Sequence, residues 1–350
     1  DPFFLTSEAS SPALLLILLA FACVTGAQPT FFSARQVVGD RSQAALASAA
    51  SKALWQVFIK VSGDEQVAAL PLVQEAIDNA RNMMSLYSYE ERDRALDLLI
   101  EFDEGVVKNV LRDAGATYWS ESRPPVLVWL VVDEPSLRRF ATASQDSDLV
   151  SGLAEGFRER GIIMRAPLLD LEDSAALSPE MVWQKVTPRI QEASVRYGTQ
   201  HILVGRYVKL TSGLQLTDWL YISGTEQRQI QDQSDELEPL LTEAVDMVVD
   251  AMAGQYAVKL DTLTSSEPLS VAINGVTSFD DYRAVIAIFE GISVLSGVRV
   301  FAVNGDQLRL SMGGVSSADA LSRLLPQRSG LAIAGEPLGR ELNLNWERAY

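Results

Sequence analysis

The chain has 350 residues, of which 47% are hydrophobic and 21% charged, and a formal net charge of −17. This acidity repels a phosphate backbone and anionic lipid, so nucleic acid is excluded as the expected partner and docking on a membrane surface is disfavoured. The single histidine excludes paired-histidine zinc motifs, and the hydrophobic content is sufficient for the cores of two or three domains.

An apolar run of twelve residues, ALLLILLAFACV, occupies positions 13–24. A membrane-spanning helix needs about 20 apolar residues, so the run matches the core of a signal peptide better than a membrane anchor. Small residues follow it, and we expect cleavage after Ala27 and export to the bacterial periplasm. No Lys or Arg precedes the run, although the first part of a signal peptide should be basic. Two alternatives stay open: a buried helix of the fold, and lipid attachment at Cys23.

Cys23 is the only cysteine, so a chain cleaved after Ala27 contains none. Disulfides and thiolate metal sites are then excluded. Cleavage also removes two acids and no base, which leaves a net charge of −15. No later apolar run is long enough to cross a bilayer, so we expect no transmembrane segment after cleavage.

The first block, residues 28–122, alternates helix and strand patterns. Apolar residues at helical spacing between Leu46 and Val61 predict a long helix that ends at Gly63. Alternating apolar residues in 96–102 predict a half-buried strand, and Asp103 is placed to cap the helix that follows. The alternation indicates an α/β layer.

The second block, residues 123–260, begins after the boundary Arg123-Pro124-Pro125. The continuous apolar run VLVWLVV predicts a strand covered on both faces. The patterns that follow predict the order β-α-β-α-β-β-β-α, with helices over 148–160, 179–198 and 237–256 and later strands over 162–164, 201–210, 214–222 and 225–231.

The third block, residues 268–350, follows the linker-like sequence TLTSSE. Two strands meet across Asn304-Gly305, a strong hairpin signal. The predicted order is βαββαβ, the order of a ferredoxin-like domain, with strands over 269–273, 298–303, 307–311 and 331–334 and helices over 278–290 and 316–325. The expected fold class is therefore mixed α/β (α+β), with several domains.

Carboxylates are the only catalytic groups that the sequence suggests. The nucleophile-elbow and phosphate-loop motifs are absent, and His201 is expected to be a half-buried strand residue. Two acidic groups follow predicted strands: Asp133 and Glu134, and then Asp170, Glu172 and Asp173. If these strands are parallel neighbours, both groups lie at one sheet edge. Two carboxylates about 5 to 9 Å apart cleave glycosides.

Two other interpretations of the same acids also stand. One group is a candidate for calcium binding, although the D-x-D-x-D-G loop is missing. The favoured interpretation is that all five acids are turn and capping residues on an acidic surface. The sequence therefore predicts no cofactor and no metal site.

An aromatic pair gives the best candidate for partner binding. Trp219 and Tyr221 lie on one face of the predicted strand 214–222, and the next strand, TEQRQIQ, is polar as an exposed edge strand should be. A free edge beside an aromatic face suits strand addition by a partner. We therefore hypothesise that both rings contact a protein partner. The alternative is that another part of the chain covers them.

Six stretches together resemble an exported proteobacterial family, domain-of-unknown-function family 2066. They are D-R-S-x-A-x-x-A at 40–47, V-S-G at 61–63, Y-S-Y at 87–89, F-D-x-x-x-V at 102–107, R-P-P-V-L-V-W-L at 123–130 and L-V-G-R-Y at 203–207. The resemblance covers roughly Thr30 to Gly254. It implies an exported location and a similar architecture, and it supplies no catalytic residues.

A looser likeness concerns architecture alone. The segment from Val126 to Tyr256 resembles the α/β domain of curli-secretion lipoproteins and the amino-terminal domain of the Tol system's translocation protein B. The first block is similar to the amino-terminal domain of flagellar T-ring proteins. Fold analogy is a weak warrant for function. We expect a non-enzymatic periplasmic binding or scaffold protein of the cell envelope that engages a protein partner. The alternative is a carboxylate-dependent hydrolase acting on envelope glycan.

Overall fold

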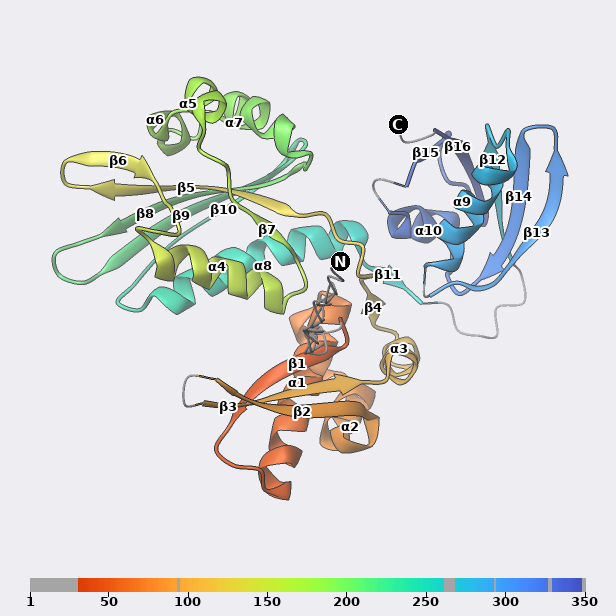
Figure 1. The fold of residues 1–350 in the computed structure, drawn as a ribbon, viewed down its shortest axis with the longest axis horizontal. Helices are drawn as coiled ribbons and strands as arrows, with labels where there is room; N and C mark the ends of the chain where they lie inside the picture. Colours follow the sequence, from red (N-terminus) through yellow and green to blue (C-terminus); the bar gives the residue numbers. More distant parts are fainter. Residues whose placement is uncertain (1–30, 93–94, 261–267, 293, 327–328, 348–350) are drawn as a thin grey trace, which may run out of the picture.

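A computed structural model describes residues 31–92, 95–260, 268–292, 294–326 and 329–347 (Figure 1). The expected signal segment, residues 1–27, and the linker-like sequence TLTSSE, residues 262–267, lie outside the described residues. Within them the protein is mixed α/β, with several separate sheets, as the sequence predicts.

The first unit packs a three-stranded antiparallel sheet on a long helix, α1 (Gln43–Ser62). The sheet order is β1-β3-β2, with β1 (Ser33–Val38), β2 (Met84–Arg92) and β3 (Ala95–Phe102). The Ser42 side chain caps α1, and Gly63 ends it at a positive φ of 73°. Fully buried Leu54, Val57 and Phe58 of α1 share one core with the sheet. The unit also contains η1 (Glu65–Ala69), α2 (Pro71–Asp78), η2 (Ala80–Met83) and α3 (Glu104–Asp113).

The second unit is built on a six-stranded sheet with the order β10-β9-β8-β5-β6, in which β7 also pairs with β5. Its strands are β5 (Val126–Glu134), β6 (Leu137–Phe140), β7 (Met164–Arg165), β8 (His201–Lys209), β9 (Gln215–Ser223) and β10 (Glu226–Ser234). β5 and β8 run parallel, and β8, β9 and β10 form an antiparallel meander. The prediction that the polar third strand lies at the sheet edge is confirmed.

Helices cover both faces of this sheet (Figure 1). One face packs against α4 (Ser147–Glu159) and α8 (Leu237–Tyr256). The other packs against α6 (Pro179–Trp183) and α7 (Thr187–Ser194), with α5 (Leu171–Ala176) and η3 (Val195–Tyr197) beside them. Alternate residues of β5 enter the two cores, which is why its sequence is continuously apolar.

The third unit has a five-stranded sheet with the order β13-β14-β12-β16-β15. Its strands are β12 (Leu269–Asn274), β13 (Ser296–Asn304), β14 (Gln307–Gly313), β15 (Leu331–Ile333) and β16 (Glu341–Trp346). Its helices α9 (Phe279–Glu290) and α10 (Ala318–Leu324) share one core with the sheet. The sequence predicts one strand after α10, but two are present. The unpredicted β16 runs parallel to β12, and β15 lies outside it.

Two short strands tie the units together. β4 (Thr117–Tyr118) leads from the first unit into the second and pairs antiparallel with β11 (Val258–Lys259), which leads from the second unit to the third. Directly after β4, the Trp119 amide donates to the Val61 carbonyl at the end of α1 (2.7 Å). The buried Arg123 guanidinium stacks on Trp119 and donates to the carbonyls of Lys60 and Arg160. These contacts join the first two units.

Candidate functional site

The first predicted acidic pair lies at the end of β5 and is held by arginines of the adjacent strand. Asp133 accepts from Arg138 (2.9 Å) and Glu134 from Arg139 (2.6 Å). Both arginines belong to β6, which forms an antiparallel hairpin with β5. The hairpin therefore converts the two acids into cross-strand ion pairs, which suits the interpretation as turn residues.

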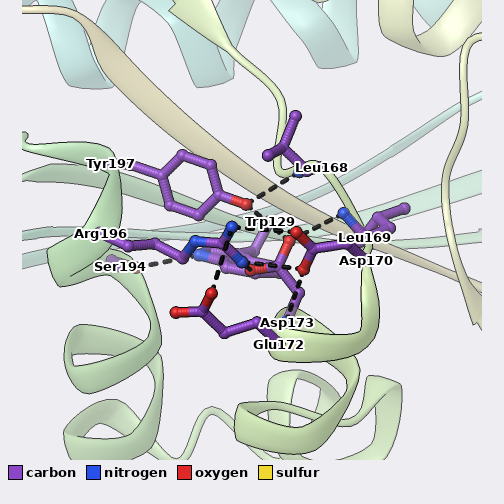
Figure 2. A network of polar contacts seen from close by, with 9 residues as sticks. All are labelled: Trp129, Leu168, Leu169, Asp170, Glu172, Asp173, Ser194, Arg196 and Tyr197. Atoms are coloured by element: carbon purple, nitrogen blue, oxygen red, sulfur yellow. Dashed lines mark hydrogen bonds and ion pairs between the residues drawn. The ribbon is translucent and has the colours of Figure 1, made fainter.

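The second acidic group forms the polar network of Figure 2. Asp170 caps α5 by accepting from the Asp173 amide (3.0 Å), and its carboxylate pairs with Arg196 (2.8 Å). Hydrogen bonds from the Arg196 guanidinium hold the pKa of Asp170 well below its usual range. Glu172 lies further from Arg196, at 3.5 Å. An acid with a depressed pKa stays ionised and cannot act as a proton donor at neutral pH.

Asp173 is the buried centre of this network, with only 1% of its surface exposed. Its carboxylate accepts from the Tyr197 hydroxyl (2.6 Å), the Leu169 amide (2.8 Å) and Arg196 (3.0 Å). Leu169 has a positive φ of 54°, an uncommon conformation for a residue with a side chain. Such strain costs of order 1–3 kcal/mol and persists only where the surroundings fix it. Here the Asp173 carboxylate is what holds the Leu169 amide.

The two acidic groups do not combine into a catalytic pair. β7 is parallel to β5 as the prediction assumes, but it pairs only with Val126 and Leu127, at the opposite end of β5 from Asp133. The ends of the two strands therefore do not meet at one sheet edge, and that prediction is wrong. In the described part of the chain, the ion pairs of the two groups share no residue. The geometry accordingly gives the hydrolase alternative no support.

The predicted aromatic contact patch is also wrong, because both rings are buried. Trp219 and Tyr221 are each 1% exposed and lie in the core between the sheet and α8. The two polar residues on that face of β9, Gln215 and Thr217, are buried as well. Among the described residues the Thr217 hydroxyl has no hydrogen-bond partner, whereas Gln215 has two. Gln215, on the same face, accepts from the Tyr207 hydroxyl (2.6 Å) and donates to the Asp235 carbonyl (3.0 Å). The apolar stripe of α8 could have indicated from the sequence that these rings are buried, because such a stripe must pack against a sheet face.

His201 is fully buried rather than half-buried, between two tyrosines. Its Nδ1 lies 2.6 Å from the Tyr221 hydroxyl, and its Nε2 lies 2.9 Å from the hydroxyl of Tyr256, the last residue of α8. Burial lowers the pKa of His201 to about 4, so the ring is neutral at physiological pH. The group fastens the end of α8 to the sheet.

A cleft of about 810 Å³ lies between the first unit and α4. Lys60 of α1 lines it and donates to the Ser33 carbonyl (2.7 Å). Burial, then repulsion by Arg123 and Arg158, lowers the pKa of Lys60 to about 8. Burial also raises the pKa of Glu159 across the cleft. Perturbed groups in a cleft mark a candidate site, but the lining holds both cations and acids, so it favours neither an anionic nor a cationic ligand.

Little in the amino-acid sequence indicates this cleft. Its walls come from blocks that are far apart in the chain, and only a lysine within the apolar run of α1 hints at an unusual amine. Within the described ranges, no three His, Cys, Asp or Glu side chains gather as a metal site requires. None of the described helices has both the length and the apolar character needed to cross a membrane.

The fold and these clusters define a mixed α/β protein of sheet-containing units that share short connecting strands. The model of a family described as a domain of unknown function, DUF8605, matches residues 27–120, which correspond to the first unit. No curated protein matches the chain. The match supports an uncharacterised domain at the start of the chain, and the resemblance to family 2066 stays a prediction.

Proposed function

We propose that this chain is a non-enzymatic binding or scaffold protein of the bacterial cell envelope, exported to the periplasm, that engages a protein partner at the free edge of β13. The observation that carries the proposal is the exposure of large apolar side chains on this strand. Phe301 is 76% exposed and Val303 is 61% exposed. Among the described residues, β13 pairs with β14 alone, so its outer main-chain groups are open to a partner.

A second edge strand of the protein, β10, is protected against pairing with another strand. β10 ends the six-stranded sheet with the sequence EQRQIQDQS, and charged or amide side chains cover most of it. Proteins use such residues to prevent edge-to-edge pairing. β13, also an edge strand, has the mostly apolar sequence VRVFAV instead. Its pairing with β14 contains two register shifts. The contrast favours β13 as the surface that a partner covers.

The third unit carries another exposed aromatic residue at the start of α9. Phe279, in the first turn of α9, is 71% exposed and stacks on Tyr282 with ring centroids 6.0 Å apart. The loop before α9 is tied to the β13–β14 hairpin, because the Val276 amide donates to the Asp306 carbonyl (2.9 Å). Large exposed apolar side chains, when they are contiguous, typically mark an interaction site. The partner that fits is an extended protein segment with apolar side chains.

The test places a photo-crosslinking amino acid at Phe301 and, as a matched control, at the exposed Gln227 of β10. In an envelope extract we expect one discrete adduct from position 301, identified by mass spectrometry, and none from position 227. The purified partner should then bind the unmodified protein, and Val303→Lys should weaken that binding at least about tenfold, or 1.4 kcal/mol.

Val303→Lys should leave the melting temperature nearly unchanged, because the side chain is exposed. The same adducts at both positions, or unchanged affinity of the Val303→Lys variant, would refute the proposed surface. Export is tested separately by the intact mass of the protein from a periplasmic extract, which should correspond to a start at Gln28. A cytosolic protein that retains residues 13–24 would contradict export.

A further inference from the structure

A second, smaller pocket lies between β5 and α4 in the second unit. It has a volume of about 300 Å³. Among the described residues that line it, none has a charged side chain and Thr142 is the one polar residue. Its floor and sides are apolar and include Val128, Leu130, Phe140, Val150, Leu153 and Met164. Ligand pockets in proteins begin at about this size, and they are mostly apolar.

One wall of the pocket is the loop of residues 166–169, which the network of Figure 2 holds in place. The Leu168 amide donates to the Tyr197 hydroxyl (2.8 Å), and the strained Leu169 donates to the buried Asp173. Trp129 and Ser194 brace the helix that leads to Tyr197, through a hydrogen bond of 2.9 Å. A buried carboxylate, an arginine and a tyrosine thus fix a loop whose own side chains are apolar.

The opposite rim is fixed in the same manner. Asp146 accepts from the Thr142 amide (3.0 Å) and pairs with Arg139 (2.6 Å). The Thr142 hydroxyl lies 3.2 Å from the hydroxyl of Ser144, so it has a partner within the rim. In each wall the polar groups named above have hydrogen-bond partners within or behind that wall. The pocket therefore presents apolar surface between two segments that are held in place.

We propose that this pocket binds a small neutral apolar molecule, of the size of one aromatic ring or a short alkyl chain. The uncharged lining gives no partner to an ionic group, and burying an unpaired charge there is costly. An apolar cavity of about 150 Å³ in another protein stays dry and takes up benzene, so about 300 Å³ is ample for such a ligand. The pinned walls mean that the space exists before the ligand arrives, which lowers the cost of binding.

Methionine methyl groups provide a direct readout, because Met164 lines the pocket and Met312 lies in the core of the third unit. The full chain is labelled with ¹³C-methyl methionine and titrated with toluene as the probe. We expect a saturable shift of the Met164 signal, assigned with Met164→Leu, and no shift of Met312. A Met164 signal that does not move up to the solubility of toluene, or equal shifts at both methionines, would overturn the proposal.

Two variants then locate the site. Val150→Phe fills the pocket and should raise the dissociation constant at least about tenfold, whereas Val195→Phe, at an exposed position, should leave it unchanged. If Val150→Phe does not fold, Asp173→Asn provides a second variant, since it loosens the Leu168–Leu169 wall and should also weaken binding. Toluene binding that is unaffected by a folded pocket variant would show that the probe binds elsewhere.

Discussion

The buried imidazole of His201 predicts that part of the stability of this protein is lost in mild acid. Its folded pKa is about 4, because burial disfavours the charged ring, whereas an unfolded histidine titrates near 6.5. Between these values the unfolded chain binds a proton that the folded protein does not. The contribution of His201 to stability is therefore fully present above about pH 6.5 and is lost as the pH falls toward 4.

The size of the effect follows from the two pKa values. At about 1.4 kcal/mol per pH unit, the difference between 6.5 and 4 corresponds to roughly 3 kcal/mol of unfolding free energy. This is a large share of the 5–15 kcal/mol typical of a folded domain. Protonation would also reverse the direction of the hydrogen bond in which a ring nitrogen accepts from a tyrosine hydroxyl, because both ring nitrogens of a charged imidazole are donors.

Two measurements test this prediction. His201 is the only histidine in the chain, so its ring signal in a proton NMR titration is unambiguous. Urea unfolding of the wild type and of His201→Gln between pH 4 and 7 then isolates its contribution. The comparison is needed because burial raises the pKa of Asp246 to about 6, which stabilises the folded state as the pH falls and gives the opposite slope. An NMR pKa near 6.5, or a stability difference between the two proteins that does not change with pH, would refute the reasoning.

Two further predictions concern packing and the junction of the first two units. Gly205→Ala should destabilise by about 1–3 kcal/mol in urea unfolding, because the added methyl group would lie 2.2 Å from the Trp219 ring, whereas Gly254→Ala, with open space in α8, should be neutral or stabilising; equal effects of the two changes would contradict this packing. Arg123→Lys should cost at least about 2 kcal/mol, because it leaves buried carbonyls unpaired, and an unchanged urea midpoint would show that these contacts contribute little.

Local signals in the sequence predicted local structure well. Gly63 ends α1, Asp103 caps α3, and the Asn304-Gly305 hairpin joins β13 and β14, each because backbone conformation depends on neighbouring residues. The continuous apolar run also gave β5 correctly, since burial on both faces leaves no alternation to read. The last strand, β16, was missed although its sequence ELNLNW alternates as a half-buried strand should, and its place in the sheet depends on pairing with β12, far away in the chain.

The candidate sites could not be predicted, because they depend on partners that periodicity does not reveal. Strand alternation separates the two faces of β9, but it does not say that α8 covers the face of Trp219. Likewise, the acids at 133 and 134 were identified from the sequence, and their arginine partners lie only five residues further on. The pairing depends on a hairpin that the short sequence of β6 does not predict. For Asp173, the decisive donors arrive on η3 and in its own loop, which only the tertiary fold brings together.

The pairing of β4 with β11 determines how mechanical load passes through the chain. Thr117 pairs with Lys259 and Tyr118 with Val258, so the first and third units attach at the same end of this ribbon, and the second unit hangs from the other end. Tension applied between the outer units therefore peels the ribbon open one residue pair at a time. The contacts of Trp119 and Arg123 that join the first two units bear load beside the ribbon. We expect the ribbon to part, and the connection between the outer units to lengthen, before the six-stranded sheet unfolds.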